Sequence, residues 1–107
     1  MKKAIHTERG GIRAGDHEGW LNLSIAATWP NAKLILTSDY LEISYSRKKC
    51  FRFKKEDIHS IEFYSSSLYQ GILFSHSKKE VPKFLVFWSF RRKKLLNILR
   101  ENGWSVK

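Results

Sequence analysis

The sequence predicts a mainly β protein in which about seven short strands precede a single C-terminal helix. From Trp20 onward, apolar residues recur at every second position in short runs, and turn-forming residues separate these runs, as is typical of strands. After Ser89 the apolar residues recur at the three- and four-residue spacing of an amphipathic helix. The chain has 107 residues, 42% of them hydrophobic and 14% aromatic, which is enough for one domain with a packed core.

The predicted strands show the alternation of a half-buried sheet. Leu41, Ile43 and Tyr45 share one face of their run, and Phe51 and Phe53 point to the core from the next run. The last run is apolar on both faces, so both of its faces should be covered. The WPN segment is turn-like, although its proline could instead begin the following strand. The predicted strands cover residues 20–28, 32–38, 40–46, 50–55, 58–65, 71–77 and 83–89.

The predicted helix covers approximately residues 89–102. Ser89 is suited to the N-cap position, and Gly103 stands where a left-handed residue commonly ends a helix. One face of this helix is mostly apolar and should pack on the strands. The residues on that face are Leu95, Leu96, Ile98, Leu99 and Asn102.

Four consecutive cations in the first turns of this helix are unusual, because the N-terminal end of a helix carries partial positive charge and favours anions. Arg91 and Arg92 lie at the margins of the apolar face, from which they could reach water or the acids of residues 56–62. Lys93 and Lys94 point outward. An exposed cation here costs about 0.3–1 kcal/mol, which a packed helix tolerates.

The first part of the chain differs from the rest. It is polar and contains glycine at positions 10, 11, 15 and 19, a composition typical of loosely ordered segments. We therefore predict a flexible N-terminal lead-in over residues 1–19 and a folded domain over residues 20–107.

The order of these segments resembles the pleckstrin-homology-like (PH-like) superfamily, in particular its GRAM-like and small bacterial members. AKLILTSDYLEI (residues 32–43) is similar to the strand–turn–strand of those domains, and FRFKKEDIHSIE (residues 51–62) to their strand followed by D-I-x-x-I-E. GILFSH and VPKFLVFWSF are similar to their closing strands. The resemblance implies a strongly bent, seven-stranded antiparallel barrel capped by the C-terminal helix, and it implies a binding module without catalytic activity.

Charge is the most unusual feature of the composition. Twenty lysines and arginines against ten acids give a formal net charge of +10, which bears on attraction to nucleic acid or anionic membranes but not on the fold. No apolar run is long enough for a membrane span, and the first residues lack the hydrophobic core of a secretory signal. Cys50 is the only cysteine, so an internal disulfide is excluded. We expect a bacterial cytoplasmic protein that could also lie peripherally at the inner membrane face.

Two predicted loops carry runs of cations, and the resemblance places them among the loops that hold phosphoinositides in PH-like domains. The K-x-[KR]-type cluster of the lipid-binding members is missing, because Leu34 and Ile35 follow Lys33. We therefore expect loops that are solvated, or that attract anions weakly and diffusely. The candidate anion-contact and membrane-contact residues are Arg47, Lys48, Lys49, Lys78 and Lys79, and the second anion candidates are Arg91, Arg92, Lys93 and Lys94.

The chain has more aromatic residues than a core of this size can bury. Aromatic residues on a surface favour protein contacts, and an exposed edge strand could also pair with an extended partner. The run KKCFRFKK resembles the aromatic sheet motif of RNA-recognition domains, but its phenylalanines are predicted to face the core. The candidate protein-contact residues are Trp29, Tyr40, Tyr45, Tyr64 and Tyr69.

No motif for catalysis or metal binding stands out. The chain lacks the G-x-S-x-G, Walker and G-x-G-x-x-G patterns, and it lacks histidine or cysteine clusters with metal-ligand spacing. Cations around Cys50 could lower the pKa of its thiol, but no base lies beside it. Asp57 is expected to cap a turn.

We therefore predict a non-enzymatic module without cofactor, metal or small-molecule ligand. Its partner would be a protein, and its basic face would add attraction to acidic partners or to anionic lipid. The alternative is a nucleic-acid-binding protein that uses the net charge of +10.

Overall fold

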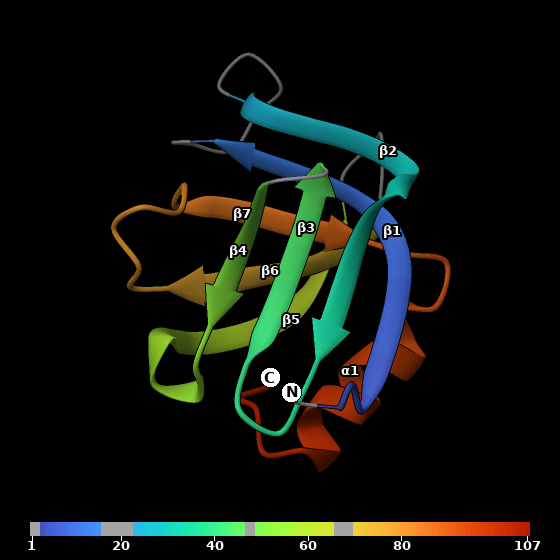
Figure 1. Ribbon diagram of the computed structural model, residues 1–107, viewed down its shortest axis with the longest axis vertical. Helices are drawn as coiled ribbons and strands as arrows, with labels where there is room; N and C mark the ends of the chain where they lie inside the picture. Colours follow the sequence, from blue (N-terminus) through green and yellow to red (C-terminus); the bar gives the residue numbers. More distant parts are fainter. Residues whose placement is uncertain (1–2, 16–22, 47–48, 66–69) are drawn as a thin grey trace.

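Seven antiparallel strands form one continuous sheet that curls strongly into a half-barrel, and one helix follows them (Figure 1). The computed structural model describes residues 3–15, 23–46, 49–65 and 70–107. The predicted mainly β class with a C-terminal helix is confirmed. The elements are β1 (His6–Gly15), β2 (Leu23–Leu36), β3 (Leu41–Ser46), β4 (Lys49–Phe53), a 3-10 turn (Lys55–Asp57), β5 (Ile58–Ser65), β6 (Gln70–His76), β7 (Phe84–Trp88) and α1 (Arg92–Glu101).

The central strand of the sheet comes from the segment that the sequence predicts to be a flexible lead-in. The strand order is β4-β3-β2-β1-β7-β6-β5, so β1 pairs with β2 on one side and with β7 on the other. The prediction for residues 1–19 is therefore wrong over residues 6–15. Its glycines indicated a loop, but Gly10 and Gly11 serve close packing instead. A Cβ atom on either would lie 2.2 Å from an atom of Trp88.

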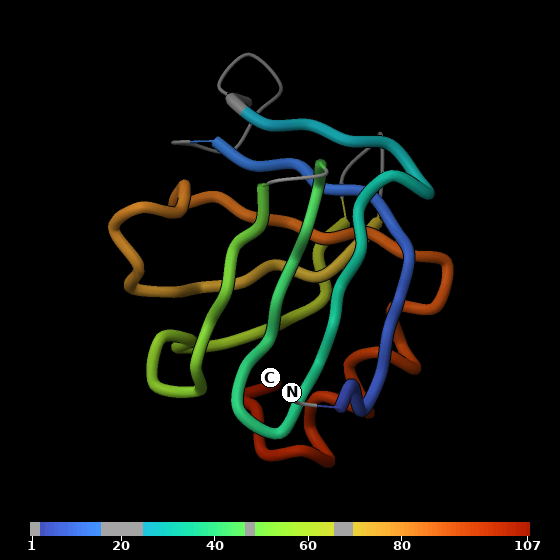
Figure 2. The backbone as a smooth tube through the Cα atoms, in the orientation of Figure 1, coloured from blue at the N-terminus to red at the C-terminus, as the bar shows by residue number. Residues whose placement is uncertain are grey.

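β2 joins two of the predicted strands into one of 14 residues. Its register with β1 jumps from Gly10↔Ala32 to Ile12↔Ala27, so residues 28–31 lie opposite Gly11 alone. The predicted turn at WPN is this bulge, and bulges bend a sheet. In Figure 2, β1 and β2 run side by side and both change direction sharply in this region. The predicted number of strands is right only because one strand was missed and two were joined.

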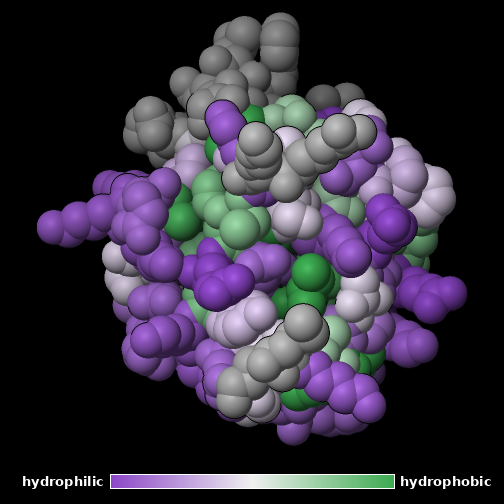
Figure 3. Space-filling view, viewed as in Figure 1, coloured by the Kyte–Doolittle hydropathy of each residue, from purple (hydrophilic) through white to green (hydrophobic). Residues whose placement is uncertain are grey.

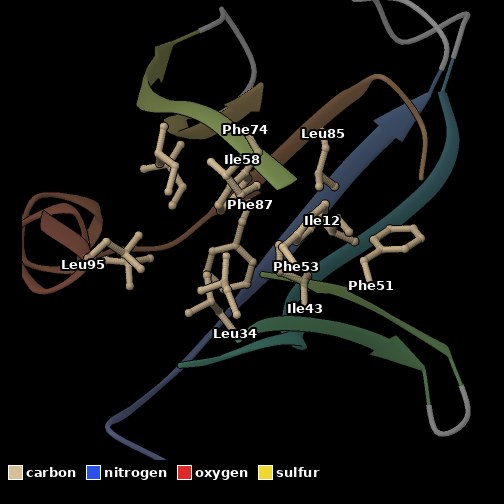
Figure 4. Close-up of a cluster of buried hydrophobic side chains, with 14 of the residues drawn as sticks. Ile12, Leu34, Ile43, Phe51, Phe53, Ile58, Phe74, Leu85, Phe87 and Leu95 are labelled. Atoms are coloured by element: carbon tan, nitrogen blue, oxygen red, sulfur yellow. The ribbon is translucent and has the colours of Figure 1, made fainter. Parts of the chain in front are cut away.

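The core lies inside the curl of the sheet, and α1 covers one end of it. The Phe53 and Phe74 rings are nearly parallel, with centroids 6.3 Å apart, and Leu95 points from α1 toward the cluster (Figure 4). Both faces of β7 are covered, as predicted: four of its five residues are buried. Every strand contributes at least one fully buried side chain, among them Ile12, Leu34, Ile43, Phe53, Ile61, Phe74 and Phe87.

α1 begins at Arg92 rather than near Ser89, and Arg91 takes the N-cap position. At the other end Gly103 has a φ of +87°, the predicted left-handed C-terminal residue. Trp104 is buried behind it, and its backbone N–H donates to the Leu99 carbonyl at 3.1 Å. Val106 then forms a parallel bridge with Ile61, so the last residues lie against the edge strand β5.

Candidate functional site

A cleft of about 370 Å³ lies where the start of β1, the bulge of β2 and the segment between β7 and α1 meet. Its volume is at the lower end of the range for small-ligand sites. Three separate parts of the chain build it, and the sheet order explains why they meet, because β1 lies between β2 and β7. The lining residues are Thr7, Glu8, Arg9, Trp29, Ser89, Phe90 and Arg91.

A buried carboxylate forms part of the cleft wall. Glu8 is 7% exposed, and two partners satisfy it. The Ser89 hydroxyl donates to Oε2 of Glu8, and Nε2 of His6 lies 2.9 Å from Oε1. Burying a carboxylate is costly unless it is hydrogen-bonded, so these contacts explain how β1 keeps an acid at this position. Because His6 contacts the carboxylate rather than the hydroxyl, Ser89 has no imidazole base beside it in the described residues.

Two exposed aromatic rings stand over the cleft. Trp29 is 45% exposed and Phe90 is 79% exposed, and their ring centroids lie 5.5 Å apart in an edge-to-face arrangement. Trp88 lies 6.2 Å from Phe90, also edge to face. Large apolar side chains exposed side by side are typical of contact surfaces rather than of ordinary monomer surface. This pair is therefore the candidate contact surface among the residues that the structure describes.

Two arginines flank these rings. Arg9 is exposed, and its Nη1 is 3.5 Å from the Pro30 carbonyl. Arg91 is exposed too, and its backbone N–H donates to the Ser89 hydroxyl at 3.0 Å. Among the residues that the structure describes, no carboxylate or carbonyl pairs with the Arg91 guanidinium. The charge that the cleft presents to solvent is therefore positive, although its wall contains an acid.

The first predicted anion site is only partly within the described residues, which do not include Arg47 and Lys48. Lys49 and Lys79 are exposed. The Lys78 side chain forms contacts within the protein. Its Nζ donates to the Arg52 carbonyl at 2.7 Å and lies 3.4 Å from Oε1 of Glu80. Hydrophilic side chains line the left, lower and right margins of the face in Figure 3, not one side of it.

The second predicted anion cluster is divided by the structure. Arg91 lines the cleft, whereas Nη1 of Arg92 donates to the Tyr64 carbonyl and to the Ser65 hydroxyl, each at 3.3 Å. The Arg92 guanidinium also lies 5.0 Å from the centroid of the Phe63 ring. Arg92 therefore contacts β5 through a carbonyl, a hydroxyl and a ring, and not through the acids of residues 56–62. Lys93 and Lys94 are exposed on the first turn of α1.

Of the predicted aromatic contact residues that the structure describes, only Trp29 lines the cleft. Tyr40 lies under the Arg52 guanidinium at 4.1 Å, Tyr45 packs on Phe51 with ring centroids 5.1 Å apart, and Tyr64 packs on Phe84 at 5.5 Å. Tyr69 lies outside the described residues. Sequence reasoning missed Phe90 and Glu8, since Phe90 fell inside the predicted helix start and Glu8 inside the predicted lead-in.

The basic aromatic run of β4 is structural. Phe51 and Phe53 are buried, so they cannot stack on nucleic-acid bases. Arg52 faces outward and forms a cross-strand pair with Glu42, with Nη2 to Oε1 at 2.8 Å. Asp57 caps the turn after β4, as expected, because its Oδ2 accepts the Lys54 backbone N–H at 2.8 Å.

The pKa of the Cys50 thiol is raised, although the cationic residues near it in the sequence favour a lower pKa. Partial burial and the nearby Glu42 carboxylate raise the pKa of its thiol, and Arg52 only partly opposes them. The expectation of a lowered pKa is therefore wrong, because burial and the Glu42 carboxylate together outweigh the effect of Arg52. Residues 3–15, 23–46, 49–65 and 70–107 contain no group of three or more metal-binding side chains.

In the part of the chain that the structure describes, no helix is both long and apolar enough to cross a membrane. Comparison with protein-family models, curated proteins and solved structures gives no match to this chain. The cleft must therefore be interpreted from its own geometry.

Proposed function

We propose that this chain is a non-catalytic, PH-like binding module that docks a protein partner at the cleft beside Trp29 and Phe90. One observation carries the proposal: the two rings stand exposed and in contact over a cleft of about 370 Å³. Tryptophan and arginine are enriched among the residues that dominate protein interfaces, and both types line this cleft.

Hydrogen bonds in the wall of the cleft favour binding without large rearrangement. Glu8, Ser89 and the Arg91 backbone N–H form a continuous chain of hydrogen bonds on either side of Phe90 in the sequence. A surface that is already ordered loses less conformational entropy when a partner binds. This supports a docking role for the segment between β7 and α1.

The remaining charge has a secondary role in this proposal. Lys49, Lys79, Lys93 and Lys94 are exposed, and the net charge of +10 would draw acidic partners or an anionic leaflet toward the protein. We place the protein in the bacterial cytoplasm, with weak peripheral contact to the inner membrane face. Loss of all sedimentation with anionic vesicles at about 0.15 M salt would remove the membrane contact from the proposal.

The test is selection of twelve-residue peptides from a random display library on the immobilised chain, followed by fluorescence polarisation with the enriched peptides. Phe90→Ala and Trp29→Ala should each weaken binding by at least about tenfold, because truncating a central interface residue costs well over 1.4 kcal/mol. Phe63→Ala is the matched control, since Phe63 is 51% exposed on β5. Peptides that bind all variants equally would overturn the proposal.

Nucleic-acid binding is the second candidate, and the net charge of +10 beside exposed rings favours it. Single strands are bound by basic surfaces that offer aromatic rings to the bases. Binding of both DNA and RNA oligonucleotides that weakens steeply with salt, without sequence preference, would support this candidate.

A further inference from the structure

We infer that the cleft takes an acidic segment of a partner protein, with one apolar side chain against Trp29 and Phe90 and a carboxylate beside Arg91. This inference rests on the proposed function and adds the chemistry of the partner. It follows from three features of the cleft: the accessible charge, the position of the acid, and the start of α1.

The charge that a ligand can reach is that of the arginines. Arg91 and Arg9 both line the cleft and are exposed, and no acid of the described residues forms an ion pair with the Arg91 guanidinium. A guanidinium has five N–H donors, so the one 3.5 Å contact of Arg9 with the Pro30 carbonyl leaves most of its donors for a ligand. Arginine pairs bidentately with carboxylates, which makes a glutamate or aspartate side chain the fitting partner group.

Glu8 does not neutralise the positive charge that Arg9 and Arg91 present to a ligand. Glu8 is 7% exposed, and both of its carboxylate oxygens already have partners, one in Ser89 and the other in His6. A ligand in the cleft therefore meets two exposed arginines and an acid whose oxygens already have partners. A cationic segment would find two exposed like charges and one covered acid, so charge complementarity favours an acidic segment.

The start of α1 favours the same ligand. α1 has ten residues and no acid in its first turn, although the N-terminal end of a helix favours negative charge. Lys93 and Lys94 are exposed there instead. The carboxylate that the first turn of α1 does not itself contain would come from the partner, beside Arg91.

The ring geometry favours a side chain over a nucleobase. The planes of Trp29 and Phe90 are inclined at 66°, so they do not form two parallel faces between which a base could be sandwiched. An aliphatic or aromatic side chain can fill the angle between two rings set edge to face. An apolar residue within an acidic peptide meets both requirements.

The test compares each enriched peptide with an analogue in which Asn and Gln replace Asp and Glu. We expect enriched peptides that place acids beside an apolar residue. Their analogues should bind about tenfold more weakly, which is the effect of losing one hydrogen bond between charged groups. Arg91→Gln should weaken the acidic peptide about tenfold and leave its neutral analogue unchanged. Lys79→Gln is the charge-matched control, because Lys79 is exposed in the loop at the opposite end of β7.

The outcomes separate the two proposals. Peptides that need Phe90 but bind equally well as neutral analogues would overturn the acidic partner and leave the docking function standing. Loss of any dependence on Phe90 and Trp29 would overturn both. Tighter binding of a fluorescein-labelled oligothymidylate, abolished by Phe90→Ala, would replace the acidic segment with single-stranded nucleic acid.

Discussion

The hydroxyl of Ser89 donates a hydrogen bond to the carboxylate of Glu8, which joins residues 81 positions apart in the sequence. The bond ties β1 to the segment between β7 and α1. It thereby fixes Phe90 and Arg91 beside Trp29, and it gives a buried acid the partner that its burial requires. The same hydrogen bond therefore contributes to the stability of the fold and to the position of the residues that line the cleft.

Ser89→Ala should lower the free energy of unfolding by about 1–3 kcal/mol, because it leaves a buried carboxylate with one partner fewer. Urea denaturation followed by tryptophan fluorescence measures this. Ser75→Ala on β6 is the matched control, since Ser75 is exposed. Equal stability of the two variants would show that the Glu8–Ser89 bond contributes nothing.

Gly10→Ala should destabilise the protein more than Gly11→Ala. A Cβ on Gly10 would lie 2.2 Å from the Trp88 backbone carbonyl, whereas a Cβ on Gly11 would meet the Trp88 indole at the same distance. Backbone in the middle of the sheet cannot move aside, but a half-buried side chain can. Overpacking costs about 1–3 kcal/mol, and Gly10→Ala should lie at the upper end or above it. Thermal unfolding of the two variants checks the order, which a reversed ranking would contradict.

Phe90→Ala should leave the stability unchanged within about 0.5 kcal/mol, as for most surface substitutions. Phe90 is 79% exposed, so its removal opens no cavity. Phe53→Ala is the contrasting variant, because Phe53 is fully buried and its loss should cost about 3–5 kcal/mol. If Phe90→Ala unfolded the protein, the ring would have a structural role.

Cys50 should react slowly with thiol reagents, because burial and Glu42 raise the pKa of its thiol. Less of it is thiolate at a given pH near 8 than of an ordinary cysteine, and the thiolate is the reactive form. Glu42→Gln should lower this pKa and speed the reaction, since it removes the acid and leaves Arg52 unopposed. The rate of reaction with a disulfide reagent between about pH 7 and 10 measures both. A slower Glu42→Gln variant would contradict the stated cause.

Local patterns in the sequence predict most of the sheet correctly. The alternation of Leu41 and Ile43 and of Phe51 and Phe53 faces the core as expected, and Gly103 ends α1 as expected. These predictions succeed because each depends on residues close together in the chain. The capping roles of Asp57 and Gly103 are local in the same sense.

The failures concern residues whose roles depend on distant partners. In the sequence, glycine at positions 10 and 11 is typical of a loop, but in the structure Trp88 packs against both residues. Glu8 likewise resembles an ordinary surface acid, but in the structure it is buried and accepts a hydrogen bond from Ser89. The sequence places Phe90 in the first turn of the predicted helix. In the structure the helix begins at Arg92, and the Phe90 ring is exposed. The cleft was therefore outside the reach of sequence reasoning, although one of its rings, Trp29, was a candidate.

The most direct test of the binding site is a nuclear magnetic resonance titration of the ¹⁵N-labelled chain with an enriched acidic peptide. We expect the largest amide shifts at residues 7–9 and 89–91, together with a shift of the Trp29 indole N–H. Small shifts are expected for the Lys49 and Lys79 amides, which belong to the predicted basic-loop site. Largest shifts at residues 49 and 77–79, with the cleft unchanged, would contradict the account.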